Sequence, residues 1–115
     1  MFYKKLNNEL EICDYAQDWE IIINRDYSDS KIIPGSFVDW DNTPRNKHGV
    51  LYEGFTIEKF EKYMKRLVKR ANKESKPIIF INAWNEWAEG AFLEPDETYG
   101  YQKLEAIKKA LEAES

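Results

Sequence analysis

Three stretches of the chain repeat apolar residues at the spacing of an amphipathic helix. The repeats predict one helix over about residues 14–25, a longer one after Thr56, and a third near the C-terminus. Thr56 is a good N-cap residue, and Glu58 suits the first turn of the second helix. The apolar positions of the three helices are Tyr15, Trp19, Ile22 and Ile23; Phe60, Met64, Leu67, Val68 and Ala71; and Leu104, Ile107 and Leu111.

Two short apolar runs predict β-strands. The first is interrupted by Pro34-Gly35 within residues 32–38, which indicates a bulge or a sheet edge at the proline. The second, residues 77–81, is continuous and rich in β-branched residues, which favours a fully buried parallel strand. The predicted order is helix, strand, loop, helix, strand, loop, helix. This alternation predicts an α/β fold of parallel βαβα units with right-handed crossovers.

Both predicted strands are followed by long polar loops, residues 39–55 and 83–98. The first has about 17 residues, whereas βα connections usually have about 2–6, and long loops in compact folds tend to be functional. Ligands of parallel α/β folds bind beyond the carboxyl ends of the strands. We therefore expect the two loops to open onto the same face.

The length of 115 residues favours a single domain over 1–115 and excludes a complete (β/α)₈ barrel, which needs about 250 residues. The domain divides into a helical lead-in (1–30), a strand-loop-helix unit (31–75) and a second such unit (76–113). A composition of 43% hydrophobic and 33% charged residues is typical of a globular protein. Basic residues crowd the end of the second helix, and we interpret them as a solvated helix face.

Charge and residue counts exclude several classes of partner and cofactor. The net charge of −4 argues against a protein that binds nucleic acid through phosphates. No apolar run is long enough for a membrane span, and the polar N-terminus does not resemble a signal peptide, so we expect a cytoplasmic location. Cys13 and His48 are the only residues of their kinds, which excludes the usual zinc sites. There is no Gly-rich phosphate cradle either, and we expect neither a metal nor a cofactor.

Aromatic residues are in excess, with 17 in the chain, and three of the four tryptophans lie in the two loops. Indole rings stack on the apolar faces of sugars, while carboxylates, amides and arginine bind sugar hydroxyls. The loops therefore predict a carbohydrate site. Its candidate substrate-binding residues are Asp39, Trp40, Asp41, Asn42, Arg45, Trp84, Asn85, Trp87 and Glu94.

Glu86 and Glu89 lie three residues apart, just after the second strand. Glycosidic bond cleavage uses two carboxyl groups in one cleft, one protonated and one ionised. Burial against a neighbouring tryptophan and like-charge repulsion would separate their pKa values in this way. The alternative is a pair of ordinary surface carboxylates, since 21 acidic residues make such spacing common.

Two long motifs resemble the WbsX-like family: residues 84–95 (Trp-Asn-Glu-Trp-Ala-Glu-Gly-Ala-Phe-Leu-Glu-Pro) and residues 39–45 (Asp-Trp-Asp-Asn-Thr-Pro-Arg). These bacterial proteins are associated with lipopolysaccharide O-antigen and other surface polysaccharides. They are described as glycosyltransferases and are similar to the endo-mannosidase-type barrels of glycoside hydrolase family 99. The resemblance covers nearly all of residues 30–112.

The resemblance implies roles for the two carboxylates. Glu86 matches the base that acts on the sugar's own neighbouring hydroxyl, in a retaining route through an epoxide-like intermediate. Glu89 matches the general acid/base that protonates the leaving oxygen, and Glu94-Pro95 also has a counterpart. Residues 39–45 are implied to bind substrate. Glycosyl transfer and mannoside-type hydrolysis both remain open, because both reactions can use the same pair of carboxylates.

The family's barrel has eight βα units, and the chain supplies only two with one preceding helix. We therefore expect the C-terminal fragment of a (β/α)₈ TIM barrel, inactive alone, which either self-associates or needs the missing N-terminal part of the barrel. The leading hypothesis is the catalytic part of an enzyme acting on bacterial surface polysaccharide. The alternatives are a glycan-binding remnant without catalysis, and a structural module, which leaves the loop tryptophans unexplained.

Overall fold

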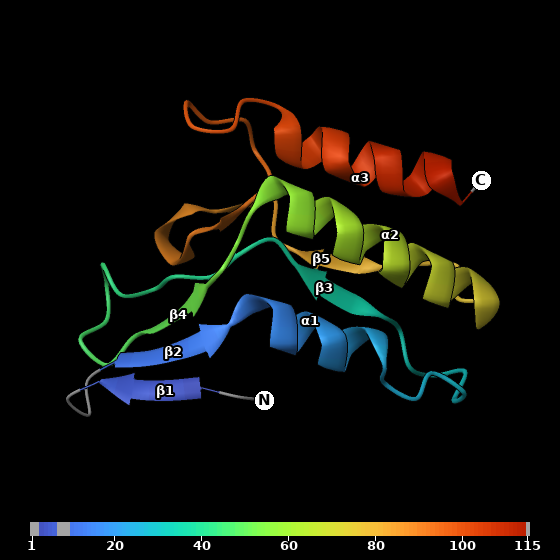
Figure 1. The fold of residues 1–115 in the computed structure, drawn as a ribbon, viewed down its shortest axis with the longest axis horizontal. Helices are drawn as coiled ribbons and strands as arrows, with labels where there is room; N and C mark the ends of the chain where they lie inside the picture. Colours follow the sequence, from blue (N-terminus) through green and yellow to red (C-terminus); the bar gives the residue numbers. More distant parts are fainter. Residues whose placement is uncertain (1–2, 7–9, 115) are drawn as a thin grey trace.

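The fold was analysed in a computed structural model, which describes residues 3–6 and 10–114 (Figure 1). The three α-helices are α1 (Tyr15–Ile23), α2 (Ile57–Lys73) and α3 (Gln102–Ala113), and a 3₁₀ helix, η1, spans Trp87–Glu89. The strands are β1 (Tyr3–Leu6), β2 (Leu10–Asp14), β3 (Gly35–Phe37), β4 (Val50–Glu53), β5 (Phe80–Asn82), β6 (Asn85–Glu86) and β7 (Ala91–Phe92).

The strands form three small sheets. β3 and β5 pair in parallel, with Gly35 opposite Phe80, and α2 lies between them in the chain. This pairing confirms the predicted parallel unit of strand, helix and strand. β2 pairs in parallel with β4 and antiparallel with β1, while β6 and β7 form a short antiparallel pair. The chain is therefore a mixed α/β fold with short parallel strand pairs.

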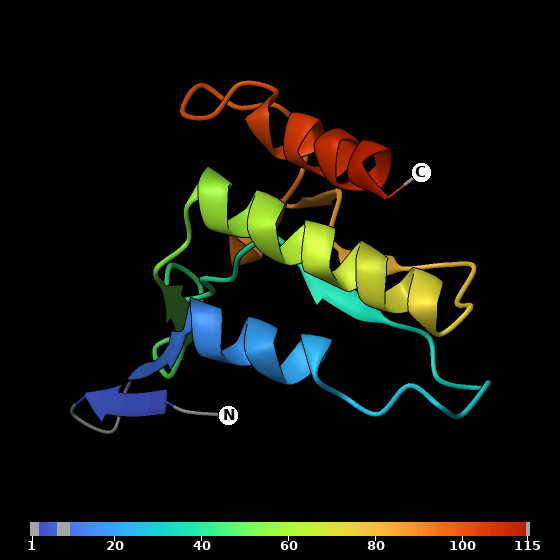
Figure 2. The same cartoon turned by 45° about the vertical axis from the view of Figure 1, so that its right-hand side comes forward.

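The three α-helices lie in a layer, with α2 between α1 and α3, as both ribbon views show (Figures 1 and 2). The loops that follow β3 and β5 gather at one end of the molecule, to the left in Figure 1. No helix in residues 3–6 and 10–114 combines the length and hydropathy needed to cross a membrane.

Helix α1 confirms the first predicted helix and carries the centre of the core. Asp14 caps its N-terminus by accepting a hydrogen bond from the Gln17 amide. Trp19 is fully buried, and its ring stacks on Phe37 and Tyr63 at centroid distances of 5.5 and 5.6 Å. These contacts join α1, β3 and α2 through a single side chain.

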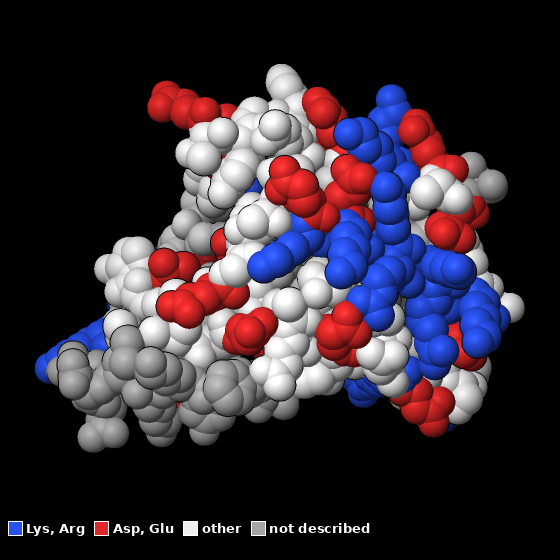
Figure 3. Space-filling model, in the orientation of Figure 1, with Lys and Arg blue, Asp and Glu red and all other residues white. Residues whose placement is uncertain are grey.

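Helix α2 begins where the sequence predicts, after Thr56, whose side chain accepts a hydrogen bond from the Lys59 amide. All five predicted apolar positions are buried, since they lie on one face of the helix. The opposite face is basic, as Figure 3 shows for the region over α2. Three of its basic side chains pair with acidic neighbours, as expected of a solvated helix face: Lys65 with Glu61, Arg66 with Glu20, and Arg70 with Glu74.

The predicted inner face of α3 is partly wrong. Leu104 and Ile107 are half-buried against the core, but Leu111 is 55% exposed. The buried positions are instead Lys103, Ala106 and Ala110. The small alanines let α3 approach α2 closely, and the lysine is buried against aromatic rings, which a count of apolar residues does not anticipate.

The prediction that residues 77–81 form a fully buried strand is wrong. Only Phe80 and Ile81 of this run belong to β5, and Phe80 is 62% exposed and Ile78 51% exposed. Ile79 and Ile81 pack against the core, whereas Ile78 and Phe80, which alternate with them, are exposed in the described structure. The apolar composition of the run therefore reflects two faces, of which only one is packed here.

The sequence prediction also omitted β1, β2 and β4. β1 and β2 precede α1 within residues 1–30, which the prediction describes as a helical lead-in. β4 lies inside the predicted loop 39–55, where it pairs with β2. The first long loop is thus partly a strand, and its free portion is shorter than the sequence suggests.

Replacing Trp19 by alanine is expected to destabilise the fold by about 3–5 kcal/mol, the usual cost of removing a large buried aromatic ring. Urea unfolding followed by circular dichroism measures the change. Ile21→Ala is the matched control on the same helix, because Ile21 is exposed and its loss should cost less than about 0.5 kcal/mol. Equal costs for the two variants would contradict the placement of Trp19.

Candidate functional site

The two predicted loops are joined to each other through their backbones. The Asp41 amide donates to the Glu89 carbonyl oxygen at 2.7 Å, and the Val38 amide donates to the Asn82 carbonyl oxygen at 3.1 Å. Residues 39–55 and 83–98 therefore meet at the carboxyl ends of β3 and β5. The prediction that both loops open onto one face is confirmed.

The first loop folds back on itself as a narrow hairpin. The Asn42 amide donates to the Val50 carbonyl oxygen, and the Tyr52 amide donates to that of Trp40 at 2.9 Å. The Asn42 Oδ1 atom accepts from the Val50 amide at 2.7 Å. The Asp41 Oδ1 atom accepts from the Thr43 amide and hydroxyl. Two predicted substrate-binding residues thus use one oxygen each to hold the loop.

Glycines allow the two loops to come this close. A side chain at Gly49 would begin 2.8 Å from Asn42 Oδ1, too near for any Cβ atom. Gly90 has a φ of +62°, a left-handed conformation that favours glycine, and a Cβ there would lie 3.3 Å from the Asp41 nitrogen. Gly90 therefore both ends η1 and leaves room for the first loop.

The second loop presents Glu86 and Glu89 on a tight turn. β6 and β7 pair across η1, so that Glu86 directly precedes this 3₁₀ helix and Glu89 ends it. The two carboxylates therefore flank a single turn of the chain, with Glu86 at its N-cap and Glu89 as its last residue. The Trp84 carbonyl oxygen closes the base of the turn by accepting from the Leu93 and Glu94 amides.

The two carboxylates have different environments. Glu86 is exposed, whereas Glu89 is half-buried. The Oε2 atom of Glu89 is buried and has no hydrogen-bond partner among the described residues. A buried oxygen without a donor costs free energy, and such atoms occur at sites where a ligand or water supplies the missing hydrogen bond.

The two tryptophans of the second loop remain open to solvent. Trp84 is 52% exposed and Trp87 is 49% exposed. One face of Trp87 stacks on Phe92 at a centroid distance of 3.8 Å, and its Nε1–H donates to Glu94 Oε1 at 2.9 Å. The orientation of the Trp87 ring is therefore fixed, and the exposed part of the ring is accessible to a ligand. This geometry suits a platform for an apolar sugar face.

Lys103 of α3 supports this loop from inside the protein, and the sequence prediction missed it. It is buried, and its Nζ atom donates to the Phe92 carbonyl oxygen at 3.1 Å and lies 3.7 Å from the Phe92 ring centroid. Burial lowers the pKa of Lys103, while Asp96 and Asp39 act in the opposite direction. The lysine thus connects α3 to the stacked pair of Phe92 and Trp87.

Asp39 lies just past β3, where functional side chains of parallel folds are found. Burial raises the pKa of Asp39 to about 6, although the hydrogen bond from the Trp40 amide and the charge of Lys103 lower it. Its carboxyl group therefore titrates in a range useful for proton transfer or for binding hydroxyls.

Arg45 and Asn85, the remaining predicted binding residues, have exposed side chains. Arg45 lies in the hairpin turn, where its backbone amide donates to the Asn42 carbonyl oxygen. Asn85 begins β6 next to Glu86. Both are on the loops that meet, and their roles stay predictions.

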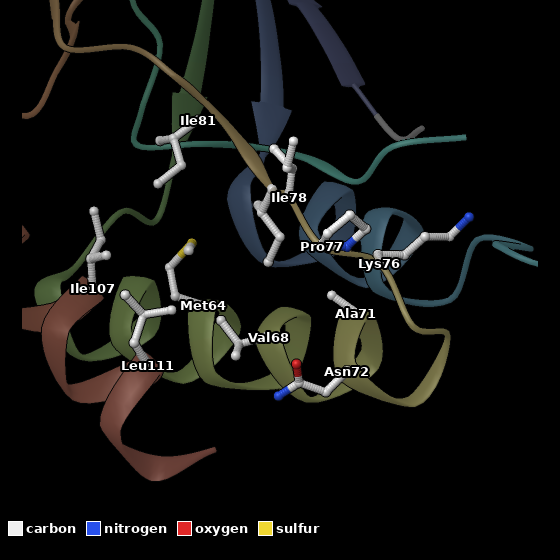
Figure 4. A pocket seen from close by; sticks show the side chains of 11 residues that line it. Met64, Val68, Ala71, Asn72, Lys76, Pro77, Ile78, Ile81, Ile107 and Leu111 are labelled. Atoms are coloured by element: carbon white, nitrogen blue, oxygen red, sulfur yellow. The ribbon is translucent and has the colours of Figure 1, made fainter. Parts of the chain in front are cut away.

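A separate apolar pocket of about 230 Å³ lies beside residues 76–79, where the chain approaches β5. Figure 4 shows side chains of α2 and α3, among them Met64 and Ile107, pointing towards Ile78 and Ile81. No carboxylate lines it, so the pocket does not contribute to the candidate chemistry. Among the described residues there is no group of three or more His, Cys, Asp or Glu side chains placed to hold a metal ion.

Comparison with known proteins identifies relatives of the chain. The family described as "Glycosyltransferase WbsX" matches residues 2–107. Proteins described as "Uncharacterized protein WxcX", from two strains of Xanthomonas campestris pv. campestris, are each 41% identical to the chain. Each alignment covers 85% of the chain but 14% of the relative, so the chain spans a small part of these proteins. No solved structure matches the chain.

Lys103→Met is expected to raise the pKa of Asp39 above about 6, because it removes the positive charge that lowers it. The midpoint is measured by NMR titration of the Asp39 side-chain carboxyl carbon. Lys108→Met is the control, since Lys108 is an exposed lysine of the same helix. An Asp39 midpoint that stays the same or falls in Lys103→Met would show that the two groups are not coupled.

Asp39→Asn is expected to change the pH dependence of stability. The Asp39 pKa of about 6 lies above the ordinary 3.8, so the folded state holds this proton more tightly than the unfolded state. The contribution of Asp39 to stability is therefore complete below about pH 4 and is lost as the pH rises towards 6. The stability of Asp39→Asn relative to the wild type should increase over this range in urea unfolding. A difference that stays constant over this range would contradict the assignment.

Proposed function

The chain belongs to the WbsX glycosyltransferase family, and we propose that its two joined loops form part of a site that acts on glycosidic bonds of bacterial surface polysaccharide. The observation that carries the proposal is the contact between the two motif loops. The Asp41 amide binds the Glu89 carbonyl oxygen, so the tryptophans and carboxyl groups of both motifs lie at one end of the parallel strands. This is the place where α/β folds bind their ligands.

In the proposed mechanism the two glutamates divide the proton transfers. Glu89 donates a proton to the leaving oxygen of the glycosidic bond, and its buried, unpaired Oε2 atom is a position where that proton or a substrate hydroxyl fits. Glu86, exposed at the start of the same turn, acts as the base on the sugar's neighbouring hydroxyl. The new bond forms when that hydroxyl oxygen displaces the protonated leaving group. Water or an acceptor sugar then opens the intermediate.

β3 and β5 are, in this proposal, neighbouring strands of a (β/α)₈ barrel. Their parallel pairing, the helix between them and the loops at their carboxyl ends support it. The exposed Phe80 and Ile78 side chains support it as well, because the interior of such a barrel is filled by apolar side chains from several strands. The chain then needs further strands for activity, supplied by a longer protein or by another chain.

Glu86→Gln and Glu89→Gln are each expected to lower turnover by roughly 10²–10⁴-fold while glycan binding persists, because the amide keeps the shape of the side chain but cannot exchange the proton. Turnover is measured on mannan and O-antigen oligosaccharides. The chain is assayed alone and together with the preceding barrel strands of a longer family member.

Glu97→Gln is the matched control, since Glu97 is an exposed carboxylate of the same loop. The catalytic roles are refuted if the two glutamine variants stay as active as Glu97→Gln. A wild type that binds these glycans without turning any of them over would favour the glycan-binding alternative. The exposed indole faces of Trp84 and Trp87 suit that alternative too.

A further inference from the structure

A second pocket, of about 430 Å³, lies beside the first motif loop, and neither Glu86 nor Glu89 is among the residues that line it. Its walls come from β2, β4 and the hairpin, and include Glu11, Trp40, Asn42 and Tyr52. Trp40 and Asn42 flank Asp41, whose amide binds the Glu89 carbonyl oxygen. Two residues that line the pocket are therefore the sequence neighbours of Asp41, the residue that links the two loops.

The register of the parallel pair β2–β4 explains why these side chains share the pocket. Glu11 lies opposite Val50, and Cys13 lies opposite Tyr52. Side chains alternate between the two faces of a strand, so these four residues project from the same face. All four line the pocket, whereas Glu53, one residue after Tyr52, projects from the other face.

The aromatic wall is rigid. The Tyr52 hydroxyl donates to Asp18 Oδ2 at 2.5 Å, and the Tyr52 ring lies 4.7 Å from that of Phe37 between centroids. The backbone bond from the Tyr52 amide to the Trp40 carbonyl oxygen fixes the two residues to each other. A wall held in this way loses little conformational entropy when a ligand stacks on it.

The polar atoms of the pocket complement hydroxyl groups. The Glu11 carboxylate lines the pocket, and its oxygens are hydrogen-bond acceptors that no described side chain engages. Asn42 uses Oδ1 for the Val50 amide, so its Nδ2 atom remains as a donor. One carboxylate acceptor and one amide donor beside an aromatic wall form the usual set of partners for a sugar ring.

We propose that this pocket is a second saccharide subsite, which holds a neutral hexose unit next to the unit at Glu86 and Glu89. The proposal rests on the proposed function and adds to it the class of substrate. Among the described residues that line the pocket, Glu11 alone carries a charge, and its negative charge disfavours uronic and other acidic sugars. The substrate is then an oligosaccharide with at least one neutral unit beside the reacting bond.

The test compares binding of methyl α-mannopyranoside and D-glucuronate to the chain by ¹H–¹⁵N NMR. The neutral sugar should shift the signals of Glu11, Trp40 and Tyr52, and glucuronate should not. Glu11→Gln should weaken binding of the neutral sugar about tenfold, since the amide oxygen that replaces the carboxylate is an uncharged and weaker acceptor. Glu53→Gln, on the opposite face of the same strand pair, should leave the affinity unchanged.

Trp40→Ala should abolish binding. If Trp40→Ala does not fold, the isosteric Glu11→Gln variant still tests the subsite. The subsite is refuted if neither sugar binds, if both bind equally, or if Glu11→Gln binds as tightly as the wild type. Shifts confined to Trp84 and Trp87 would refute the subsite and leave the proposed function standing. Binding in the pocket without loss of turnover in the Glu86 and Glu89 variants would refute the catalytic roles alone.

Discussion

Val38 is the residue on which the arrangement of the site depends, because both of its backbone groups bind other elements. Its amide donates to the Asn82 carbonyl oxygen at the end of β5, and its carbonyl oxygen accepts from the buried Tyr15 hydroxyl of α1. Its side chain is fully buried in the core. The next residue, Asp39, begins the first motif loop. The position of that loop is thus fixed by one strand pairing and one helix contact before any of its own interactions is formed.

The loops then use part of their polar chemistry to hold themselves. Asp41, Asn42 and Trp84 each give an oxygen to backbone amides of their own loop, and Lys103 supports the second loop from α3. One buried side-chain oxygen of the loops, Glu89 Oε2, remains without a hydrogen-bond partner among the described residues. A binding site needs side chains that are fixed by some of their atoms and free at others. The motif residues meet that condition, which explains why long polar segments fold into one shape.

The sequence predicts an element well when the residues that define it lie within one continuous segment, and poorly when they are far apart in the chain. α2 was predictable because a cap and five apolar positions lie within one continuous segment. β4 was not, because it has four residues between polar segments and is stabilised by pairing with β2, about forty residues earlier in the chain. A lysine in an amphipathic helix is usually exposed, and Lys103 is buried because aromatic rings of the folded loop cover it. The contact between the loops was predictable from topology, whereas the unpaired oxygen of Glu89 depends on exact packing.

The open face of β5 bears on the chemistry as well as on the fold. General acid catalysis by a carboxyl group relies on exclusion of water, which strengthens the electrostatic interactions around it. Asp39 and Glu89 already lie partly inside the protein, but Glu86 and the faces of Trp84 and Trp87 are open to solvent. The exposed apolar side chains of Phe80 and Ile78 lie at the strand that leads into these residues. In the proposed barrel, further strands packed on that face would bury Phe80 and would also close the space around the glutamates. Completing the core and excluding water from the site would then be the same structural event.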